Sequence, residues 1–343
     1  MNIATVILAI IFIYVVNILF HKYSILLNNN GEKHQNYTSG GKVPLTGGIF
    51  LLALLTLFFY NSKNEIIIIS LSFLFLLGIS SDLKILNSPR LRILFQAIIV
   101  FSTIYIINLT ILRTGIEFID FILSYHYFNL LFVTFCILIV INGTNFIDGL
   151  NGLAIGYYSI ILYQLVIMNF FISGEFFSSQ ESIILFIFFI IIFAFNILNK
   201  MFIGDSGSYL LGFIFAIWVV FLQHKFVNIS PFYIILLLWY PCFENLFSII
   251  RKNLISKSAM RPDEDHLHQL IFFYLKNKTR YSILKSNNLS STLIILYNIL
   301  AISIATSNPY STYLQILIIV FSIIVYLFFY LKLFFFKYKK FNV

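Results

Sequence analysis

The feature that most constrains this chain is a set of long apolar runs that recur along its whole length. A bilayer core of about 30 Å requires roughly 17–25 apolar residues per crossing helix, and helices satisfy every backbone polar group within lipid. Of the 343 residues, 60% are hydrophobic and only 10% are charged, which excludes a soluble globular domain or a disordered chain. The sequence therefore predicts an all-α, polytopic membrane protein that forms one transmembrane domain over residues 1–343.

The same runs predict how many times the chain crosses the membrane. They lie near residues 2–20, 45–60, 65–80, 93–110, 128–144, 150–172, 182–198, 207–222, 231–249, 291–306 and 312–334. Each is predicted to be one helix, so we expect about 11 transmembrane helices.

Alternating crossings divide the basic residues very unequally between the two sides. One set of loops holds 19 of the 22 Lys and Arg residues, and the other holds only Lys63, Arg113 and Lys225. The positive-inside rule assigns the crowded side to the cytoplasm, so the N-terminus is expected outside and the C-terminus inside. The first basic residue, Lys22, follows the first run, which predicts a retained helix rather than a cleaved signal peptide. Because the net charge of +9 lies beside the membrane, we expect membrane lipids and no nucleic acid as partners.

Polar residues at the cytoplasmic ends of the predicted helices are the candidates for chemistry, since ionisable groups at membrane depth are costly. They occur in five loops near 21–46, 80–92, 143–151, 199–207 and 250–290. In the first, Lys42 precedes Gly47-Gly48. Lys42 is a mobile charge suited to binding phosphate, and the glycines let a backbone approach a ligand closely. A plain turn entering a helix is the alternative.

Two further loops contain an aspartate at a helix end. Asp82 is followed by Lys84, Arg90 and Arg92, and Asp205 lies directly before an apolar run. A carboxylate among basic groups can orient a phosphate, and Mg²⁺ is commonly held by one or two carboxylates together with substrate phosphates. The alternatives are a solvated, capped loop at Asp82 and an N-capped helix start at Asp205.

The loop near 143–151 contains Asn145, Asp148 and Asn151 between two apolar runs, where a simple turn would need only glycine. Asparagine side chains both donate and accept hydrogen bonds, as recognition of a base or sugar requires. We therefore interpret these residues as a binding or catalytic segment. A glycine-rich helix reversal is the alternative.

The last loop contains Arg261, His266 and His268. His-x-His without further ligands is poor zinc spacing, whereas Arg and His suit an anionic pyrophosphate; a solvated charged loop is the alternative.

The five loops together indicate one kind of chemistry. Carboxylates for a metal, basic groups for phosphates and amides for a nucleotide predict phosphoryl transfer at the cytoplasmic membrane surface. In such reactions, positioning and charge neutralisation supply most of the catalysis.

These segments, in this order, resemble those of the bacterial polyprenyl-phosphate N-acetylhexosamine-1-phosphate transferases, which belong to glycosyltransferase family 4 and include enzymes that transfer GlcNAc 1-phosphate to undecaprenyl phosphate. The resemblance covers residues 42–269. It rests on Lys42 with Pro44 and Gly47-Gly48, Asp82 with Lys84, Asn145-Phe-Ile-Asp148-Gly-Leu, Gly204-Asp205-Ser-Gly-Ser208, and Pro262 with His266-Leu-His268.

The resemblance implies the reaction and its location. Polyprenyl phosphate would attack a UDP-N-acetyl sugar to give polyprenyl-diphospho-sugar and UMP, the initiating step of a cell-surface glycan. The cofactor implied is Mg²⁺, with Mn²⁺ as an alternative ion. The enzyme would be a multi-pass protein of the bacterial inner membrane with its active site on the cytoplasmic face. The sequence leaves open whether two copies form a homodimer.

The resemblance also implies roles for individual residues. Asp205 matches a metal ligand, and Asp82 and Asp148 match residues that place the substrate or metal. Asn145 matches a nucleotide-side position, and His266 and His268 match the basic loop for the sugar-nucleotide phosphates.

Together with the residue patterns, this gives the predicted site. Its catalytic residues are Asp82 and Asp148 and its metal ligand is Asp205. Its substrate-binding residues are Lys42, Asn145, Asn151, Arg261, His266 and His268.

Two departures from the family pattern concern acids. Relatives usually have a pair of acids where this chain has Ser81-Asp82, and often an acid where it has Asn151. A mechanism that needs the first acid as a general base cannot run unchanged here. The alternatives to an active transferase are therefore a catalytically weakened paralogue and, from another class, a transporter or flippase for lipid-linked sugars. A transporter should place charges deep in mid-span, whereas the acids here cluster at one face.

Overall fold

The computed structural model describes residues 3–28, 42–61, 65–168, 179–254 and 264–339. Within them the protein is helical, with no β-strand and one isolated bridge between Leu27 and Pro44. The helices are α1 (Ile3–Lys22), α2 (Gly47–Asn61), α3 (Glu65–Asp82), α4 (Pro89–Ile107), α5 (Glu117–Leu123), α6 (His126–Ile147), α7 (Leu153–Ile167), α8 (Ser179–Ile197), α9 (Gly204–Lys225), α10 (Pro231–Leu237), α11 (Trp239–Leu254), α12 (Leu267–Lys278), α13 (Ile283–Thr306) and α14 (Thr312–Lys339).

The apolar runs and the helices correspond closely. Every predicted run contains a helix, and the two helices outside the runs, α5 and α12, are short. In the described part of the chain, six helices are long and apolar enough to cross a membrane, or seven if α10 and α11 form one bent span. Four shorter apolar helices, α1, α2, α7 and α8, accompany them. The protein is therefore a multi-pass, all-helical membrane protein.

The run near 231–249 departs from the prediction, because it forms two helices that meet at 76°. The physical cause is Pro241, which has no N–H with which to continue the ladder to the carbonyl of Leu237. That carbonyl instead accepts a hydrogen bond of 2.8 Å from the hydroxyl of Tyr157 on α7. Another helix thus satisfies the backbone at the break, as an apolar interior requires.

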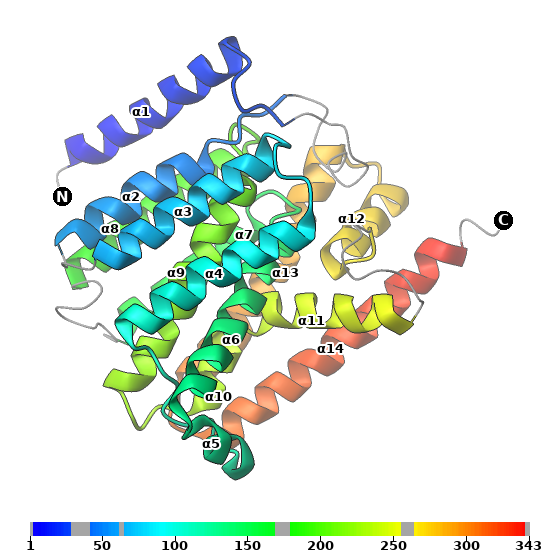
Figure 1. Ribbon diagram of the computed structural model, residues 1–343. Coiled ribbons are helices and arrows are strands. Elements are labelled where there is room, and N and C mark those ends of the chain that lie inside the picture. The colour runs from blue at the N-terminus through cyan, green and yellow to red at the C-terminus, as the bar shows by residue number, and fades with distance from the viewer. Residues whose placement is uncertain (1–2, 29–41, 62–64, 169–178, 255–263, 340–343) are drawn as a thin grey trace.

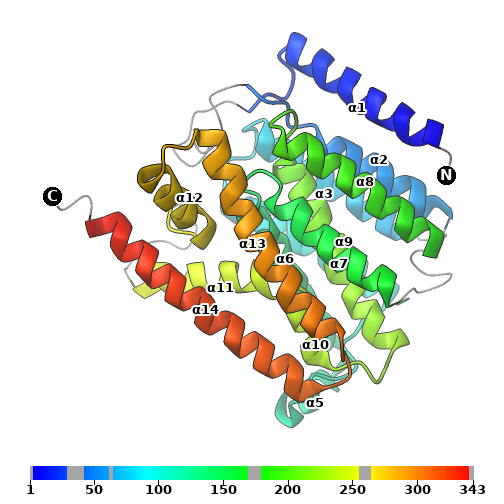
Figure 2. The same cartoon turned by 180° about the vertical axis from the view of Figure 1, so that it is seen from behind.

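Helix α9 forms the centre of the bundle (Figures 1 and 2) and packs against α6, α3 and α2. Nearly all of its residues are buried. Small residues permit the close contacts: a Cβ added at Gly212 would lie 2.7 Å from the Cα of Ile141 on α6. Since lipid provides little hydrophobic drive for association, such close packing is what holds membrane helices together.

The helix directions decide where the polar segments meet. Because α3 and α6 end where α9 begins, residues separated by more than 100 positions in the sequence are hydrogen-bonded at one end of the bundle. The C-terminal helix α14 runs along the side of the molecule opposite to α1 (Figure 1).

Candidate active site

The site is organised around the first turn of α9. Gly204 has φ +72°, and a Cβ there would lie 2.9 Å from a carboxylate oxygen of Asp82. The Asp82 side chain, at the end of α3, accepts hydrogen bonds from the backbone N–H groups of Asp205 (2.9 Å) and Ser206 (3.2 Å). These N–H groups lack partners within their own helix. Asp82 therefore caps α9 from another helix, which explains why an acid stands here.

Asp205 is the hub of the side-chain contacts. Its Oδ1 accepts a 2.7 Å hydrogen bond from Nδ2 of Asn145, and its Oδ2 accepts one of 2.9 Å from Nη1 of Arg92. The Ser81 hydroxyl donates to the same Oδ2 and accepts from Arg92. The side chains of Arg92 and Asp205 remain about one quarter exposed, so a ligand can reach this cluster.

Asp148 adds a third carboxylate at the end of α6. The backbone N–H of Gly204 donates to it, and burial together with the negative charges of Asp205 and Asp82 raises its pKa well above the usual range. Three carboxylates from three helix ends thus share one small region with Arg92. Within the described part of the chain, no group of three His, Cys, Asp or Glu side chains is arranged so that it could hold a metal ion.

The glycine pair of the first predicted segment serves packing between helices. The N–H groups of Gly47 and Gly48 donate to the carbonyls of Phe202 (2.9 Å) and Ile203 (3.2 Å). A Cβ at Gly48 would lie 2.4 Å from Oγ of Ser206. The sequence predicts that these glycines let the backbone approach a ligand. In the structure the backbone of Gly47 and Gly48 instead packs closely against the start of α9. Lys42 is exposed a few residues earlier.

The two histidines lie inside the protein, so the solvated-loop alternative does not describe them. The His266 ring packs 5.1 Å from that of Phe146 at the end of α6, and the two histidine rings stack at 5.5 Å. A Cβ at Gly149 would lie 2.8 Å from Nε2 of His268. Burial lowers the pKa of His268 to about 3, so this ring is neutral at physiological pH.

The hydrogen bonds of Asn151, another predicted site residue, lead away from the carboxylates. The Asn151 side chain donates to Asn199, and its backbone N–H donates to Oδ1 of Asn287 on α13 (2.9 Å). These hydrogen bonds connect the start of α7 to neighbouring parts of the bundle, which indicates a structural role. Arg261 lies outside the described residues.

The structure adds residues that the sequence interpretation did not include in the site. In the sequence Arg92 is one of several basic residues in a loop, and only the fold brings it to Asp205. Ser81 stands where relatives have an acid, and in the structure its hydroxyl joins Asp205 to Arg92. Glu244 binds His266. The sequence could have indicated Glu244, because an acid within an apolar run is a candidate functional residue.

The fold and site define a class: a multi-pass helical membrane protein with a cluster of carboxylates where helix ends meet. Comparison with known proteins is more specific. Residues 64–223 match the model of glycosyl transferase family 4. Over 235 residues the chain is 31% identical to the undecaprenyl-phosphate alpha-N-acetylglucosaminyl 1-phosphate transferase of Thermotoga maritima, covering 67% of this chain and 68% of that protein.

Other relatives have similar names. The Yersinia pestis protein of the same name is 25% identical over 299 residues, covering 79% of this chain and 78% of its own. A probable undecaprenyl-phosphate N-acetylglucosaminyl 1-phosphate transferase of Bacillus subtilis is 32% identical over 148 residues, which is 40% of this chain and 39% of that protein. The chain belongs to glycosyl transferase family 4, which confirms the resemblance seen in the motifs.

Proposed function

We propose that this protein transfers N-acetylglucosamine 1-phosphate from UDP-N-acetylglucosamine to undecaprenyl phosphate, releasing UMP. The names of its relatives supply the lipid acceptor, undecaprenyl phosphate, and the transferred group, N-acetylglucosaminyl 1-phosphate; UDP as the carrier of that group comes from the resemblance described above. The observation in this chain that carries the proposal is the cluster of Asp205, Asn145, Arg92 and Asp82 at the first turn of α9. It brings hydrogen-bond donors, a cation and carboxylates to one partly exposed point, as phosphoryl transfer requires.

The chemistry is a displacement at phosphorus. An oxygen of the lipid phosphate attacks the β-phosphorus of the UDP-sugar, and the bond from that phosphorus to the oxygen bridging it to the α-phosphate breaks. UMP leaves with the bridging oxygen and its electron pair. The lipid phosphate is largely ionised near pH 7 (second pKa about 6 for phosphate monoesters), so the attack needs no general base. The lack of an acid at position 81 is therefore compatible with turnover.

Each residue of the cluster has a definite task in this scheme. Arg92 lies beside Asp205 and neutralises phosphate charge, for which a guanidinium is well suited. Asn145 orients the Asp205 carboxylate through its 2.7 Å hydrogen bond. Asp82 holds the first turn of α9 in place through its bonds to two backbone N–H groups. The positive end of α9 faces the same region and favours an anionic substrate.

The donor set suits a hard divalent cation such as Mg²⁺, with Mn²⁺ as an alternative. Burial, together with the negative charges of Asp205 and Asp82, raises the pKa of Asp148, and a bound cation would relieve the repulsion among these carboxylates. Asp205 and Asp148 would hold it, with substrate phosphates completing its shell. When bound, such an ion neutralises charge that develops on the phosphates.

We also propose that the chain crosses the bacterial inner membrane 11 times, with its N-terminus outside, its C-terminus in the cytoplasm and the site at the cytoplasmic face. Two observations support this. The six long spans, the bent pair of α10 and α11 and the four shorter apolar helices together correspond to the 11 runs. The carboxylate cluster lies at the same helix ends as the loops that carry most of the Lys and Arg residues.

The experiment is a turnover assay on the purified full-length protein. Undecaprenyl phosphate, Mg²⁺ and a panel of UDP-sugars are supplied, and UMP is measured. We expect release with UDP-N-acetylglucosamine, and loss of release in Asp205→Asn, which preserves size but removes the charge. Asn277→Asp, an exposed change on α12, is the control. Full turnover by Asp205→Asn would remove Asp205 from the proposed mechanism, and no UMP with any UDP-sugar would refute the proposed function.

A further inference from the structure

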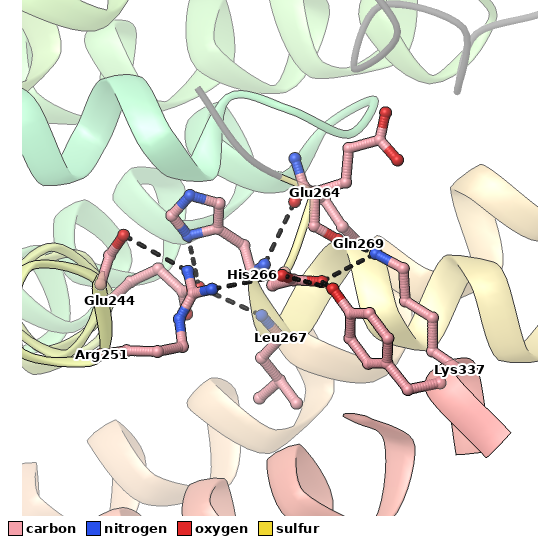
Figure 3. A network of polar contacts seen from close by, with 10 residues as sticks. Glu244, Arg251, Glu264, His266, Leu267, Gln269 and Lys337 are labelled. Atoms are coloured by element: carbon pink, nitrogen blue, oxygen red, sulfur yellow. Dashed lines mark hydrogen bonds and ion pairs between the residues drawn. The ribbon is translucent and has the colours of Figure 1, made fainter. Parts of the chain in front are cut away.

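The C-terminal helix α14 is bonded to the segment that precedes the two histidines (Figure 3). The Nζ atom of Lys337 lies 2.8 Å from Oδ1 of Asp265 and 2.7 Å from the carbonyl oxygen of Glu264. The hydroxyl of the next residue, Tyr338, donates to Oδ2 of Asp265 at 2.9 Å. Arg251 on α11 lies 3.4 Å from the same oxygen.

These contacts are shielded from solvent, which distinguishes them from an ordinary surface ion pair. The side chains of Asp265 and Lys337 are 8% and 11% exposed. Burial alone would raise the pKa of Asp265, but the Lys337 ammonium, the Tyr338 hydroxyl and Arg251 hold it below its ordinary value. Asp265 therefore stays ionised at physiological pH, and its attachment to α14 persists.

A second connection runs through Glu244 on α11. Its Oε1 accepts hydrogen bonds from Nδ1 of His266 (2.9 Å) and from the backbone N–H of Leu267 (3.1 Å). Its Oε2 accepts one of 2.7 Å from the hydroxyl of Tyr326 on α14. Helix α14 thus holds the segment at two levels, directly through Asp265 and indirectly through Glu244.

What this segment carries is the pair of histidine rings beside the end of α6. Both ring nitrogens of His268 are buried and make no hydrogen bond within the described residues, so packing alone holds this ring against Gly149. The position of His268 therefore depends on whatever fixes the backbone from Glu264 to Leu267. The contacts above assign that task to α14 together with Glu244 and Arg251 of α11.

We infer that Lys337 and Tyr338, together with Tyr326 acting through Glu244, are positioning residues that hold His266 and His268 in place for the sugar nucleotide. This inference rests on the proposed function and on the prediction from the sequence that the two histidines belong to the part of the site that binds the sugar nucleotide. It extends the functional unit to the C-terminal end of α14, beyond the residues matched by the family model.

The test compares Lys337→Met, which keeps length but removes the charge, with Lys339→Met, the same change at an exposed position on α14. Full-length protein in detergent is used for two measurements. One is amide hydrogen exchange over residues 264–270, and the other is the KM for each substrate. For Lys337→Met we expect exchange and the KM for UDP-N-acetylglucosamine to rise about tenfold, the order expected for losing a charged hydrogen bond. The KM for the lipid phosphate and kcat should change little.

Two further variants keep the inference testable if Lys337→Met fails to fold. Lys337→Arg should restore most of the affinity, because it returns the charge to Asp265. Tyr338→Phe removes only a hydroxyl from a partly exposed ring and should raise the same KM by a smaller factor. Lys339→Met should match the wild type in both measurements.

The outcomes separate this inference from the function on which it rests. Unchanged exchange in Lys337→Met would overturn the attachment itself, and raised exchange with an unchanged KM would overturn its positioning role. Either result leaves the proposed function intact, provided that the wild type turns over and His268→Gln raises the KM for the sugar nucleotide. A wild type that releases no UMP would instead refute the proposed function, and this role with it.

Discussion

Replacing Gly78 by alanine tests the close contact that positions Asp82. Gly78 lies one turn before Asp82 on α3, on the same helix face. A Cβ at Gly78 would lie 2.3 Å from the Cα of Ser206 and 2.6 Å from its backbone nitrogen. That nitrogen is one of the two donors to the Asp82 carboxylate. The added methyl group would therefore push α3 away from the residues that Asp82 caps.

The distances give the size of the effect. Carbon atoms in contact are normally about 3.5–4.0 Å apart, so the two helices must separate by roughly 1 Å there. Because the obstacle is backbone, no rotamer change can relieve it, and we expect the upper end of the overpacking range, about 3 kcal/mol of lost stability. A 1 Å displacement of a positioned group can lower turnover about 100-fold.

The assay measures thermal unfolding and UMP release for Gly78→Ala beside Gly156→Ala. The control makes the same change on α7, where the nearest atom is the flexible end of the Ile295 side chain at 2.6 Å. We expect a clear loss of stability and turnover only in Gly78→Ala. Wild-type stability and wild-type turnover in that variant would refute the contact between α3 and α9 on which the site geometry depends.

Three further predictions concern the site. Arg92→Ala should lower UMP release about 100-fold, the usual order for one lost electrostatic donor, and full turnover would exclude Arg92 from the mechanism. Ser81→Asp should change turnover less than tenfold, because a carboxylate there adds repulsion beside Asp205 but restores the acid of relatives. A rise of about 10²–10⁴-fold, as for a missing base, would instead show that this chain is a weakened paralogue. Because burial lowers the pKa of His268 from 6.5 to about 3, the unfolded chain takes up a proton below pH 6.5 that the folded protein resists. Stability should therefore fall by about 2 kcal/mol between pH 7 and pH 5. In thermal unfolding, His268→Gln should lose about 2 kcal/mol less stability than the wild type between pH 7 and pH 5. An equal loss in both proteins would contradict the conclusion that His268 is buried and neutral.

Most of the fold could be predicted from the sequence, because apolar length alone determines membrane helices. Each expected run contains a helix. The break at Leu238 was predictable in principle, since Pro241 stands within an apolar run. Helix α5 was not predictable, because Glu117–Leu123 is too short for a helical pattern of apolar residues to be recognised.

The site could be predicted only in part, because residue type does not reveal tertiary neighbours. The motifs placed Asp82, Asn145 and Asp205 in one predicted site, and hydrogen bonds join these three residues; their roles in catalysis and metal binding stay predictions. The motifs could not indicate that Gly48 approaches α9 rather than a ligand, since a glycine permits both. Nor could they reveal the contact between Arg92 and Asp205, which are 113 positions apart.

The central claim is that a sugar 1-phosphate, rather than a sugar alone, is transferred at the cluster around Asp205. The most direct measurement uses UDP-N-acetylglucosamine with a radiolabelled β-phosphate, undecaprenyl phosphate and the purified protein. The account predicts that the label appears in the lipid product, in amounts equal to the UMP released, and that Asp205→Asn forms neither. Label that remains in the nucleotide, released as UDP while the lipid gains sugar, would contradict it.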